Sequence, residues 1–165
     1  MAMQYGHVYV ARVALGAKDN QTVTALREAE AYNGPALIIA YSHCIAHGFP
    51  LHLGLDQQKL AVDSGYWPLF RFDPRLKDRR EAAFRLDSPP PKIELSRFTA
   101  NETRFGILQN IAPDRATELA QEAQLHVQQH YALYQQLAAA PASAAAGPIA
   151  PSNGHAVPAT AAPSS

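Results

Sequence analysis

The only thiol of the chain, Cys44, lies between His43 and His47 in the segment 41–48. A nucleophilic thiolate would need one of these histidines as its base, but no known nucleophile signature surrounds Cys44. A zinc ion could bind all three side chains, yet a structural zinc site normally has four ligands. The remaining possibility is that Cys44 is one ligand of a site whose other ligands come from elsewhere. The thiolates around an iron–sulfur cluster often come from separate parts of a protein in this way. A buried, unreactive cysteine is the competing interpretation.

The other titratable residues carry weaker signals. His126 and His130 stand four positions apart in a predicted helix, but no Glu follows the first, so we expect a solvated helix face. His43 and His47 either shape a cluster pocket through hydrogen bonds or are solvated, and of these alternatives we expect solvation. The sequence contains neither a Gly-rich phosphate loop nor a G-x-G-x-x-G motif. It therefore predicts no complete catalytic set in this chain.

A predicted β-α-β unit positions Cys44. Residues 8–13 are rich in β-branched and aromatic side chains and favour a strand, and residues 20–32 favour a helix that stops at Asn33-Gly34-Pro35. Residues 36–41 are apolar without alternation, which is typical of a parallel strand buried on both faces. Such a unit is expected to cross over right-handed, and ligands collect beyond the carboxyl ends of its strands. Cys44 lies in the segment 42–54 that follows the second strand.

The rest of the ordered part contributes further elements. Residues 56–64 indicate a short helix closed by Gly65, and residues 68–72 indicate a third strand. Residues 73–104 are interpreted as a long surface excursion. Between 71 and 104 there are nine basic and six acidic residues, which we interpret as a solvated face. Pro113 opens a long helix with an apolar stripe made of Leu119, Ala123, Val127, Tyr131, Tyr134 and Leu137.

Composition divides the chain near position 138. Residues 139–165 contain no Lys, Arg, Asp or Glu and consist mostly of Ala, Pro, Ser and Gly, so we expect a disordered tail. Residues 1–138 are expected to form one domain. The predicted fold class is α/β, a partial parallel sheet with flanking helices, a long C-terminal helix and the disordered tail.

Charge and hydropathy exclude several functions. Fourteen Lys and Arg balance fourteen Asp and Glu, so no net field would attract nucleic acid. No apolar run approaches the ~20 residues needed to span a bilayer. A single cysteine fits a reducing compartment. The sequence therefore predicts a soluble, cytoplasmic protein that binds neither nucleic acid nor membranes.

Four runs carry a family resemblance: 5–11 (YGHVYVA), 28–41 (EAEAYNGPALIIAY), 44–45 (CI) and 64–75 (SGYWPLFRFDPR). In this order, over roughly residues 1–138, the chain resembles the C-terminal end of pyruvate:ferredoxin (flavodoxin) oxidoreductase. The resemblance implies the later half of a thiamine-diphosphate-binding domain, which is a parallel α/β sheet domain of a much larger enzyme.

The resemblance also implies an activity and a role for Cys44. The family decarboxylates pyruvate on thiamine diphosphate with Mg²⁺, passes single electrons through [4Fe–4S] clusters to ferredoxin or flavodoxin, and releases acetyl-coenzyme A. By resemblance, Cys44 is the fourth thiolate ligand of the cluster nearest the thiamine, and the other three cysteines belong to an upstream domain. No catalytic residue is implied in this chain. Its implied partners are the remaining domains of an enzyme that is a homodimer when complete.

Departures from the family limit what this chain does alone. The family's Gly-Asp-Gly and Asn-Thr-Gly-Gly segments, which bind Mg²⁺ and diphosphate, do not occur here, and neither do the three partner cysteines. We therefore expect a truncated product, a fragment or one piece of a split enzyme, inactive in isolation. The alternative is a non-catalytic interaction module that retains a remnant of the fold. A His/Cys metal protein is a third and weaker hypothesis.

Overall fold

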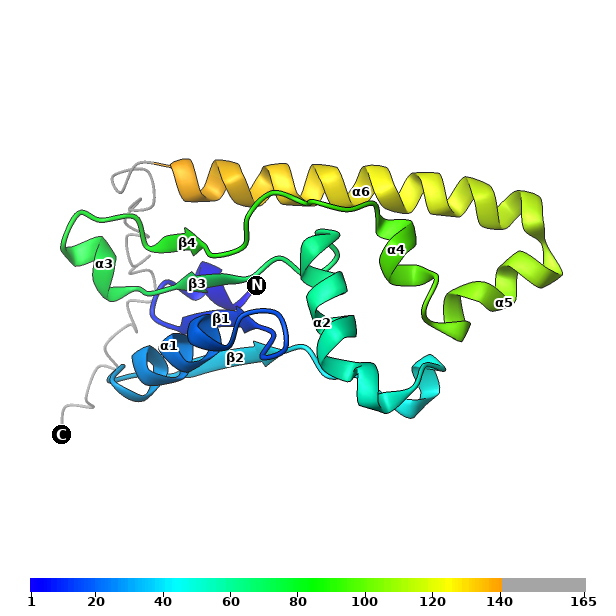
Figure 1. The fold of residues 1–165 in the computed structure, drawn as a ribbon. Coiled ribbons are helices and arrows are strands. Elements are labelled where there is room, and N and C mark those ends of the chain that lie inside the picture. Colours follow the sequence, from blue (N-terminus) through cyan, green and yellow to red (C-terminus); the bar gives the residue numbers. More distant parts are fainter. Residues whose placement is uncertain (141–165) are drawn as a thin grey trace, which may run out of the picture.

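The computed structural model describes residues 1–140, which form an open four-stranded sheet with helices packed around it (Figure 1). The strands are β1 (Tyr9–Val13), β2 (Ala36–Ala40), β3 (Phe70–Phe72) and β4 (Phe84–Leu86), in the order β2-β1-β3-β4. β1 and β2 are parallel, whereas the β1–β3 and β3–β4 pairs are antiparallel. The predicted α/β class with a partly parallel sheet is confirmed. Residues 141–165 of the predicted disordered tail lie outside the described residues.

The predicted β-α-β unit is present. Helix α1 (Asp19–Glu30) connects β1 to β2 and packs on both strands. Alternate side chains of β1 face this helix, and Tyr9, Ala11 and Val13 form a buried cluster with Ala25 of α1. Every second side chain of β1 thus packs against the apolar face of α1, and together they form one apolar layer.

The prediction that residues 36–41 are buried on both faces is wrong. β2 is the edge strand of the sheet, and Leu37 and Ile39 are 42% and 37% exposed. The uniform apolar run does form a strand, but within the described chain no further strand pairs with its outer edge. The sequence pattern therefore indicated that both faces of this strand are buried, but residues 1–140 do not cover them.

The interpretation of residues 73–104 as a surface excursion is also wrong. This stretch contains helix α3 (Arg75–Asp78), strand β4 and helix α4 (Leu95–Thr99), and helix α5 (Thr103–Ile111) begins at its end. Phe84 of β4 is buried and packs against Phe70 and Tyr134, with ring centroids 5.1 and 5.8 Å away. Elements of three to five residues are too short to give a periodic signal, so only tertiary packing defines them.

Helix α6 (Pro113–Ala139) runs along one side of the molecule beside β4, α4 and α5 (Figure 1). Val127, Tyr131 and Tyr134 are buried, as the predicted stripe requires. Ala123 and the stripe's two ends, Leu119 and Leu137, are exposed, because the sheet and the short helices cover only part of this long helix.

Four further elements complete the described chain. A turn of 3₁₀ helix, η1 (Ala2–Tyr5), precedes β1, and two more, η2 (Ile45–His47) and η3 (Leu51–Leu53), follow β2. Helix α2 (Gly54–Asp63) then begins two residues earlier than predicted and is followed by Gly65, whose φ of 78° is favourable for glycine. Among the helices in residues 1–140, none combines the length and apolar composition needed to cross a bilayer.

Candidate functional site

Cys44 lies on the surface, four residues after the end of β2 and three after Tyr41. The Tyr41 N–H donates to the Val13 carbonyl at 2.9 Å, so the parallel ladder continues one residue past the strand. Cys44 is extended, immediately precedes η2, and accepts a hydrogen bond from the His47 N–H at its carbonyl at 3.0 Å. Its thiol is free and exposed. The site residue predicted from the sequence is therefore accessible to a group outside the chain.

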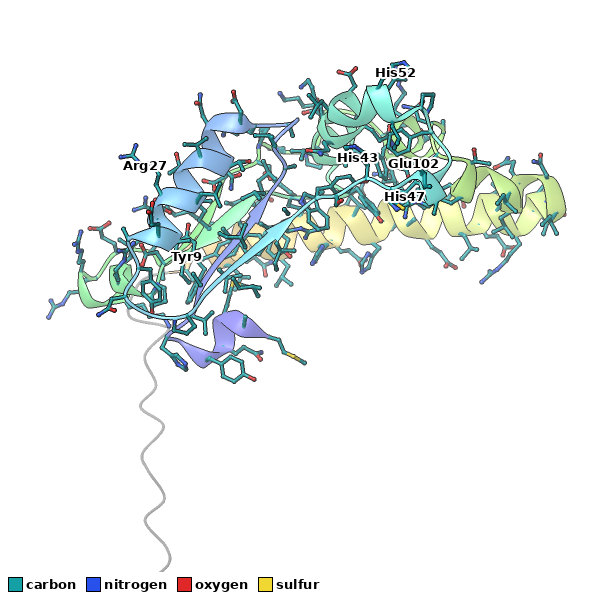
Figure 2. All side chains as sticks on the ribbon, turned by 90° about the horizontal axis from the view of Figure 1, so that it is seen from below. Tyr9, Arg27, His43, His47, His52 and Glu102 are labelled. Carbon is teal, nitrogen blue, oxygen red and sulfur yellow. The ribbon has the colours of Figure 1, made fainter. Side chains whose placement is uncertain are left out.

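His43 is held against α2 rather than solvated. Its ring meets Phe49 edge-on at 5.8 Å between centroids, and its Nδ1 lies 3.4 Å from Nε2 of Gln58. Gly54 at the start of α2 makes this contact possible, because a Cβ there would lie 2.5 Å from the His43 ring. Figure 2 shows His43 and His47 at the same end of the molecule, far from Tyr9. The expectation of a solvated His43 is wrong.

His47 is also half-buried. Its ring stacks on Phe49 with centroids 6.4 Å apart, and Phe49 itself is buried. The Nδ1 atom of His47 is buried and finds no hydrogen-bond partner among the described residues. Phe49 thus separates the two histidine rings that flank Cys44 in sequence, and the expectation of a solvated His47 is wrong as well.

Helix α5 fixes the other end of the loop. The Gly48 carbonyl accepts hydrogen bonds from the Thr103 N–H at 3.2 Å and the Thr103 hydroxyl at 2.7 Å. Gly48 has a φ of 73°, and a Cβ there would lie 2.6 Å from the Thr103 Cβ, so only glycine fits this approach without rearrangement. The loop that carries Cys44 is therefore bound to β1, α2 and α5.

A buried carboxylate lies beneath this end of the molecule, and sequence reasoning did not find it. Glu102 is fully buried, accepts from Gln57 Nε2 at 2.8 Å, and pairs with Arg104 Nε at 2.5 Å. Burial raises the pKa of Tyr41 to about 12, and the Glu102 charge adds to the rise. No motif marks Glu102, which follows a short helix and precedes another. Its burial and its bonds to Gln57 and Arg104 are visible only in the tertiary structure.

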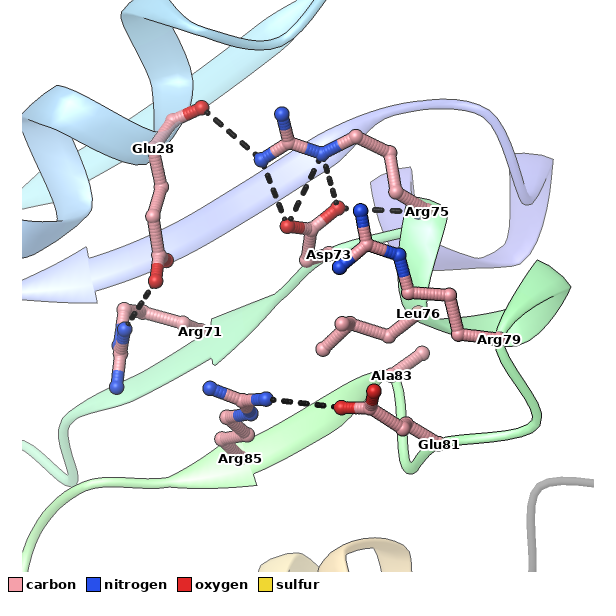
Figure 3. Close-up of a pocket in the computed structure, with 9 residues that line it drawn as sticks. All are labelled: Glu28, Arg71, Asp73, Arg75, Leu76, Arg79, Glu81, Ala83 and Arg85. Atoms are coloured by element: carbon pink, nitrogen blue, oxygen red, sulfur yellow. Dashed lines mark hydrogen bonds and ion pairs between the residues drawn. The ribbon is translucent and has the colours of Figure 1, made fainter.

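The structure also contains a cavity of about 250 Å³ bordered by residues of or next to α1, β3, α3 and β4, and lined mainly by arginines and carboxylates (Figure 3). Each of its three acidic side chains is paired: Glu28 with Arg71 at 2.6 Å, Asp73 with Arg75 at 2.8 Å, and Glu81 with Arg85 at 3.5 Å. Arg71 also binds Asp87 at 2.8 Å, and its side chain is only 15% exposed. Arg71 therefore cross-links α1, β3 and the chain after β4.

The hydrogen bonds and ion pairs of this cluster also shift the pKa values of Arg71 and Asp73. Hydrogen bonding to Asp87 raises the pKa of Arg71 above its ordinary value. Burial alone would raise the pKa of Asp73, but the hydrogen bonds and charge of Arg75 outweigh it and hold that pKa below its ordinary value. The basic excess between 71 and 104, interpreted from the sequence as a solvated face, thus includes a partly buried guanidinium that links structural elements.

The site can supply one thiolate to a metal centre. The chain has a single cysteine, and within residues 1–140 no three His, Cys, Asp or Glu side chains converge as a metal site. Cys44 fits the role of one cluster ligand, because its thiol is exposed and its loop is held at three points. A four-thiolate cluster would require three more cysteines from another part of a larger protein.

The fold and the loop define an open α/β unit that presents one accessible thiol at the carboxyl end of a parallel strand.

No protein-family model matches the sequence. The chain is 53% identical over 138 residues to a pyruvate-flavodoxin oxidoreductase of Rhodospirillum rubrum, and 52% identical over 139 residues to one of Trichormus variabilis. It is 41% identical over 138 residues to a pyruvate:ferredoxin oxidoreductase of Moorella thermoacetica.

The chain is therefore homologous to one segment of pyruvate oxidoreductases. Each of these matches covers 84% of this chain but only 12% of the relative. The chain thus spans about an eighth of the length of the curated relatives it matches, and most of each relative has no counterpart here.

Proposed function

We propose that this chain is a C-terminal segment of a pyruvate:ferredoxin or pyruvate-flavodoxin oxidoreductase and supplies one ligand, Cys44, to a [4Fe–4S] cluster. Residues 1–138 would be part of the thiamine-diphosphate-binding domain, and residues 139–165 a tail. The exposed position of the only thiol, on a loop held at the carboxyl end of β2, is the observation that supports this role. The homology to proteins named pyruvate-flavodoxin and pyruvate:ferredoxin oxidoreductase supports the proposed reaction.

The residues around Cys44 would hold and orient this side chain as a ligand of the cluster. When bound, the cluster would take up and pass on single electrons. The Thr103 contacts to Gly48 and the Tyr41 contact to Val13 fix the two ends of the loop, so the Cys44 thiolate would approach the metal from a defined backbone. Phe49, buried between the His43 and His47 rings, would limit water on the protein side of the loop.

The other components of the activity would come from outside the chain. These are the remaining domains, with the sites for thiamine diphosphate, Mg²⁺, pyruvate and coenzyme A, and ferredoxin or flavodoxin as electron acceptor. The complete enzyme would be a cytoplasmic homodimer. We expect the isolated chain to be inactive, and reduction of a viologen dye by the purified chain with pyruvate, coenzyme A, thiamine diphosphate and Mg²⁺ would contradict this.

The test of the ligand uses a complete enzyme. We would replace the matching segment of the Rhodospirillum rubrum relative with this chain and compare Cys44→Ser with the neighbouring exposed control Ala46→Ser. Cys44→Ser is expected to lose the iron, sulfide and electron paramagnetic resonance signal of one [4Fe–4S] cluster, because serine replaces its fourth thiolate. Ala46→Ser is expected to keep them. Full cluster content in Cys44→Ser would refute the proposal.

An interaction module without catalysis is the second candidate. It is supported by the exposed apolar edge strand β2, since uncovered strand edges pair with other chains. This function requires no thiolate. It therefore predicts that Cys44→Ser leaves the complete assembly and its cluster content unchanged, which is the opposite result in the same experiment.

A further inference from the structure

Arg12 projects from the face of β1 that is opposite α1. Its guanidinium carbon lies 3.7 Å from the centroid of a Trp67 ring. Its Nη1 lies 3.5 Å from the Tyr134 hydroxyl and its Nη2 lies 3.5 Å from the Tyr66 carbonyl, which are long distances for hydrogen bonds. Its Nε is buried and has no hydrogen-bond partner among residues 1–140. The guanidinium is therefore packed on an aromatic ring and bonded only weakly to neutral oxygens.

Arg12 differs in this respect from the other partly buried arginines, which within the described chain are Arg71 and Arg75. Arg71 pairs with Asp87 at 2.8 Å, and Arg75 pairs with Asp73 at 2.8 Å. No described carboxylate forms an ion pair with Arg12. Burial lowers the pKa of Arg12, whereas hydrogen bonding to Asp87 raises that of Arg71. Because buried charges in proteins are normally paired, Arg12 lacks a counter-ion that the other two arginines have.

The groups around Arg12 provide no negative charge. From α6, the rings of Tyr134 and His130 lie there with centroids 4.6 Å apart, and His126 stacks on His130 at 5.8 Å. On the sheet, Ile39 of β2 is the partner of Arg12 in the parallel ladder. Residues 141–165 contain neither Asp nor Glu. We therefore expect an anion for Arg12 to come from outside this chain.

The open side of the sheet favours a carboxylate as this anion. Leu37 and Ile39 share a face with Arg12 and are 42% and 37% exposed, so they form an apolar rim beside the guanidinium. A carboxylate held over this rim would be partly dehydrated, which strengthens the attraction between the two charges. One guanidinium balances one negative charge, and its planar N–H groups match carboxylate oxygens in a bidentate pair. A phosphate, with nearly two charges, fits this single cation less well.

We infer that Arg12 binds the carboxylate of an Asp or Glu side chain from a part of the larger protein outside this chain. The inference goes beyond the proposed function and rests on it only in placing this chain within a longer protein. The match to the Rhodospirillum rubrum relative covers 12% of that protein, so the relative contains ample further polypeptide. A free organic acid fits less well, because a single ion pair would have to offset the entropy lost on association.

Zero-length cross-linking identifies the carboxylate in the full-length chimera with the Rhodospirillum rubrum relative. Arg12→Lys places a primary amine at this position, and a carbodiimide couples an amine to a carboxylate in contact with it, with loss of water. We expect mass spectrometry to find residue 12 joined to an Asp or Glu outside this chain. Arg27→Lys, on the outer side of α1 (Figure 2), is the control and should not reach the same carboxylate. No link from residue 12, or links only to carboxylates of this chain, would overturn the inference.

The stability of the isolated chain provides a second test. Arg12→Met should not lower the urea midpoint, because methionine keeps the packing on Trp67 and removes a charge that has no partner. Arg71→Met removes a paired arginine and should lower the midpoint. A lower midpoint in Arg12→Met would show that its partners lie within this chain and would overturn the inference.

The same substitution should have the opposite effect in the chimera. There Arg12→Met leaves the carboxylate of the partner segment buried and unpaired. We expect the amides of β1 to exchange with solvent at least about tenfold faster than in the unsubstituted chimera. Arg27→Met removes an exposed charge and should leave these rates unchanged. Equal rates in the two variants would contradict an ion pair at Arg12.

Isobutyrate tests a free organic acid as the source of the carboxylate. The acid is added at millimolar concentration to the isolated chain, and the Nε–H resonance of Arg12 is followed by nuclear magnetic resonance, with Arg12→Met used to assign it. We expect no saturable change in this resonance. Saturation would identify a free acid as the ligand and overturn the assignment to a side chain.

The outcomes also separate this inference from the proposed function. A chimera that links residue 12 to an outside carboxylate but keeps its full cluster content in Cys44→Ser would retain the ion pair and refute the ligand role. A chimera that loses one cluster in Cys44→Ser but forms no link from residue 12 would retain the ligand role and refute the ion pair.

Discussion

Substitution of Gly54 by alanine directly probes how α2 positions the loop that bears Cys44. Gly54 has φ −58° and ψ −38°, which alanine adopts without strain, so the backbone itself does not disfavour the change. The added Cβ would lie 2.5 Å from the His43 ring, however, and that ring is confined by Phe49 and Gln58. Any loss of stability in Gly54→Ala is therefore steric, because the conformational effect of alanine at this position acts in the opposite direction.

The expected magnitude follows from overpacking. Inserting a methyl group into a filled site costs about 1–3 kcal/mol of unfolding free energy. Gly106 offers a matched control, because a Cβ there meets nothing within 4 Å and the residue lies inside helix α5. Gly106→Ala is expected to stabilise the chain by about 0.5–1 kcal/mol through helix propensity. The two substitutions should thus shift the urea midpoint of the 165-residue chain in opposite directions.

A double-mutant cycle assigns the cost of Gly54→Ala to the His43 ring. In a His43→Ala background the collision is removed, and Gly54→Ala should cost at least about 1 kcal/mol less than in the original chain. The reasoning is refuted if Gly54→Ala is as stable as the unsubstituted chain, or if its cost is the same with and without the His43 ring.

Three further substitutions test the interactions that hold the fold together. Arg71→Met leaves two carboxylates without their partly buried partner and should cost about 3 kcal/mol in urea unfolding, whereas Arg85→Met, an exposed pair at 3.5 Å, should cost under about 1 kcal/mol; equal costs would contradict the structural role of Arg71. The folded pKa of Asp73 lies below its ordinary value of 3.8, so its ionised form stabilises the fold above that pH, and the contribution is lost as the pH falls through the folded pKa. Asp73→Asn should therefore flatten the decline of unfolding free energy below about pH 4, and an unchanged pH profile would exclude this carboxylate as a source of acid lability. Thr103→Val removes the hydroxyl that donates to Gly48 and should cost about 1 kcal/mol in the same urea assay, with no change expected if the hydroxyl bonds water instead.

The sequence predicted the parts of the fold that depend on local patterns. The β-branched and aromatic content of residues 8–13, the helical pattern of residues 20–32 and the Asn33-Gly34-Pro35 stop predicted the β-α-β unit, which the structure contains at nearly the expected positions. The single cysteine also limited the candidate site to one residue, and the sequence placed it in the segment that follows the second strand, whereas its exposure was decided by the structure. These features follow from spacing along the chain, which is visible in the residues themselves.

Only the tertiary structure decided which surfaces are covered. The run 36–40 is equally apolar whether it lies inside a sheet or at its edge, and the pairing of neighbours in space placed it at the edge. Glu102, Arg71 and Thr103 gained their roles from partners distant in sequence, because burial and ion pairing depend on what packs nearby. Local periodicity determines which elements form, whereas contacts between distant segments determine which of their faces remain open to a partner.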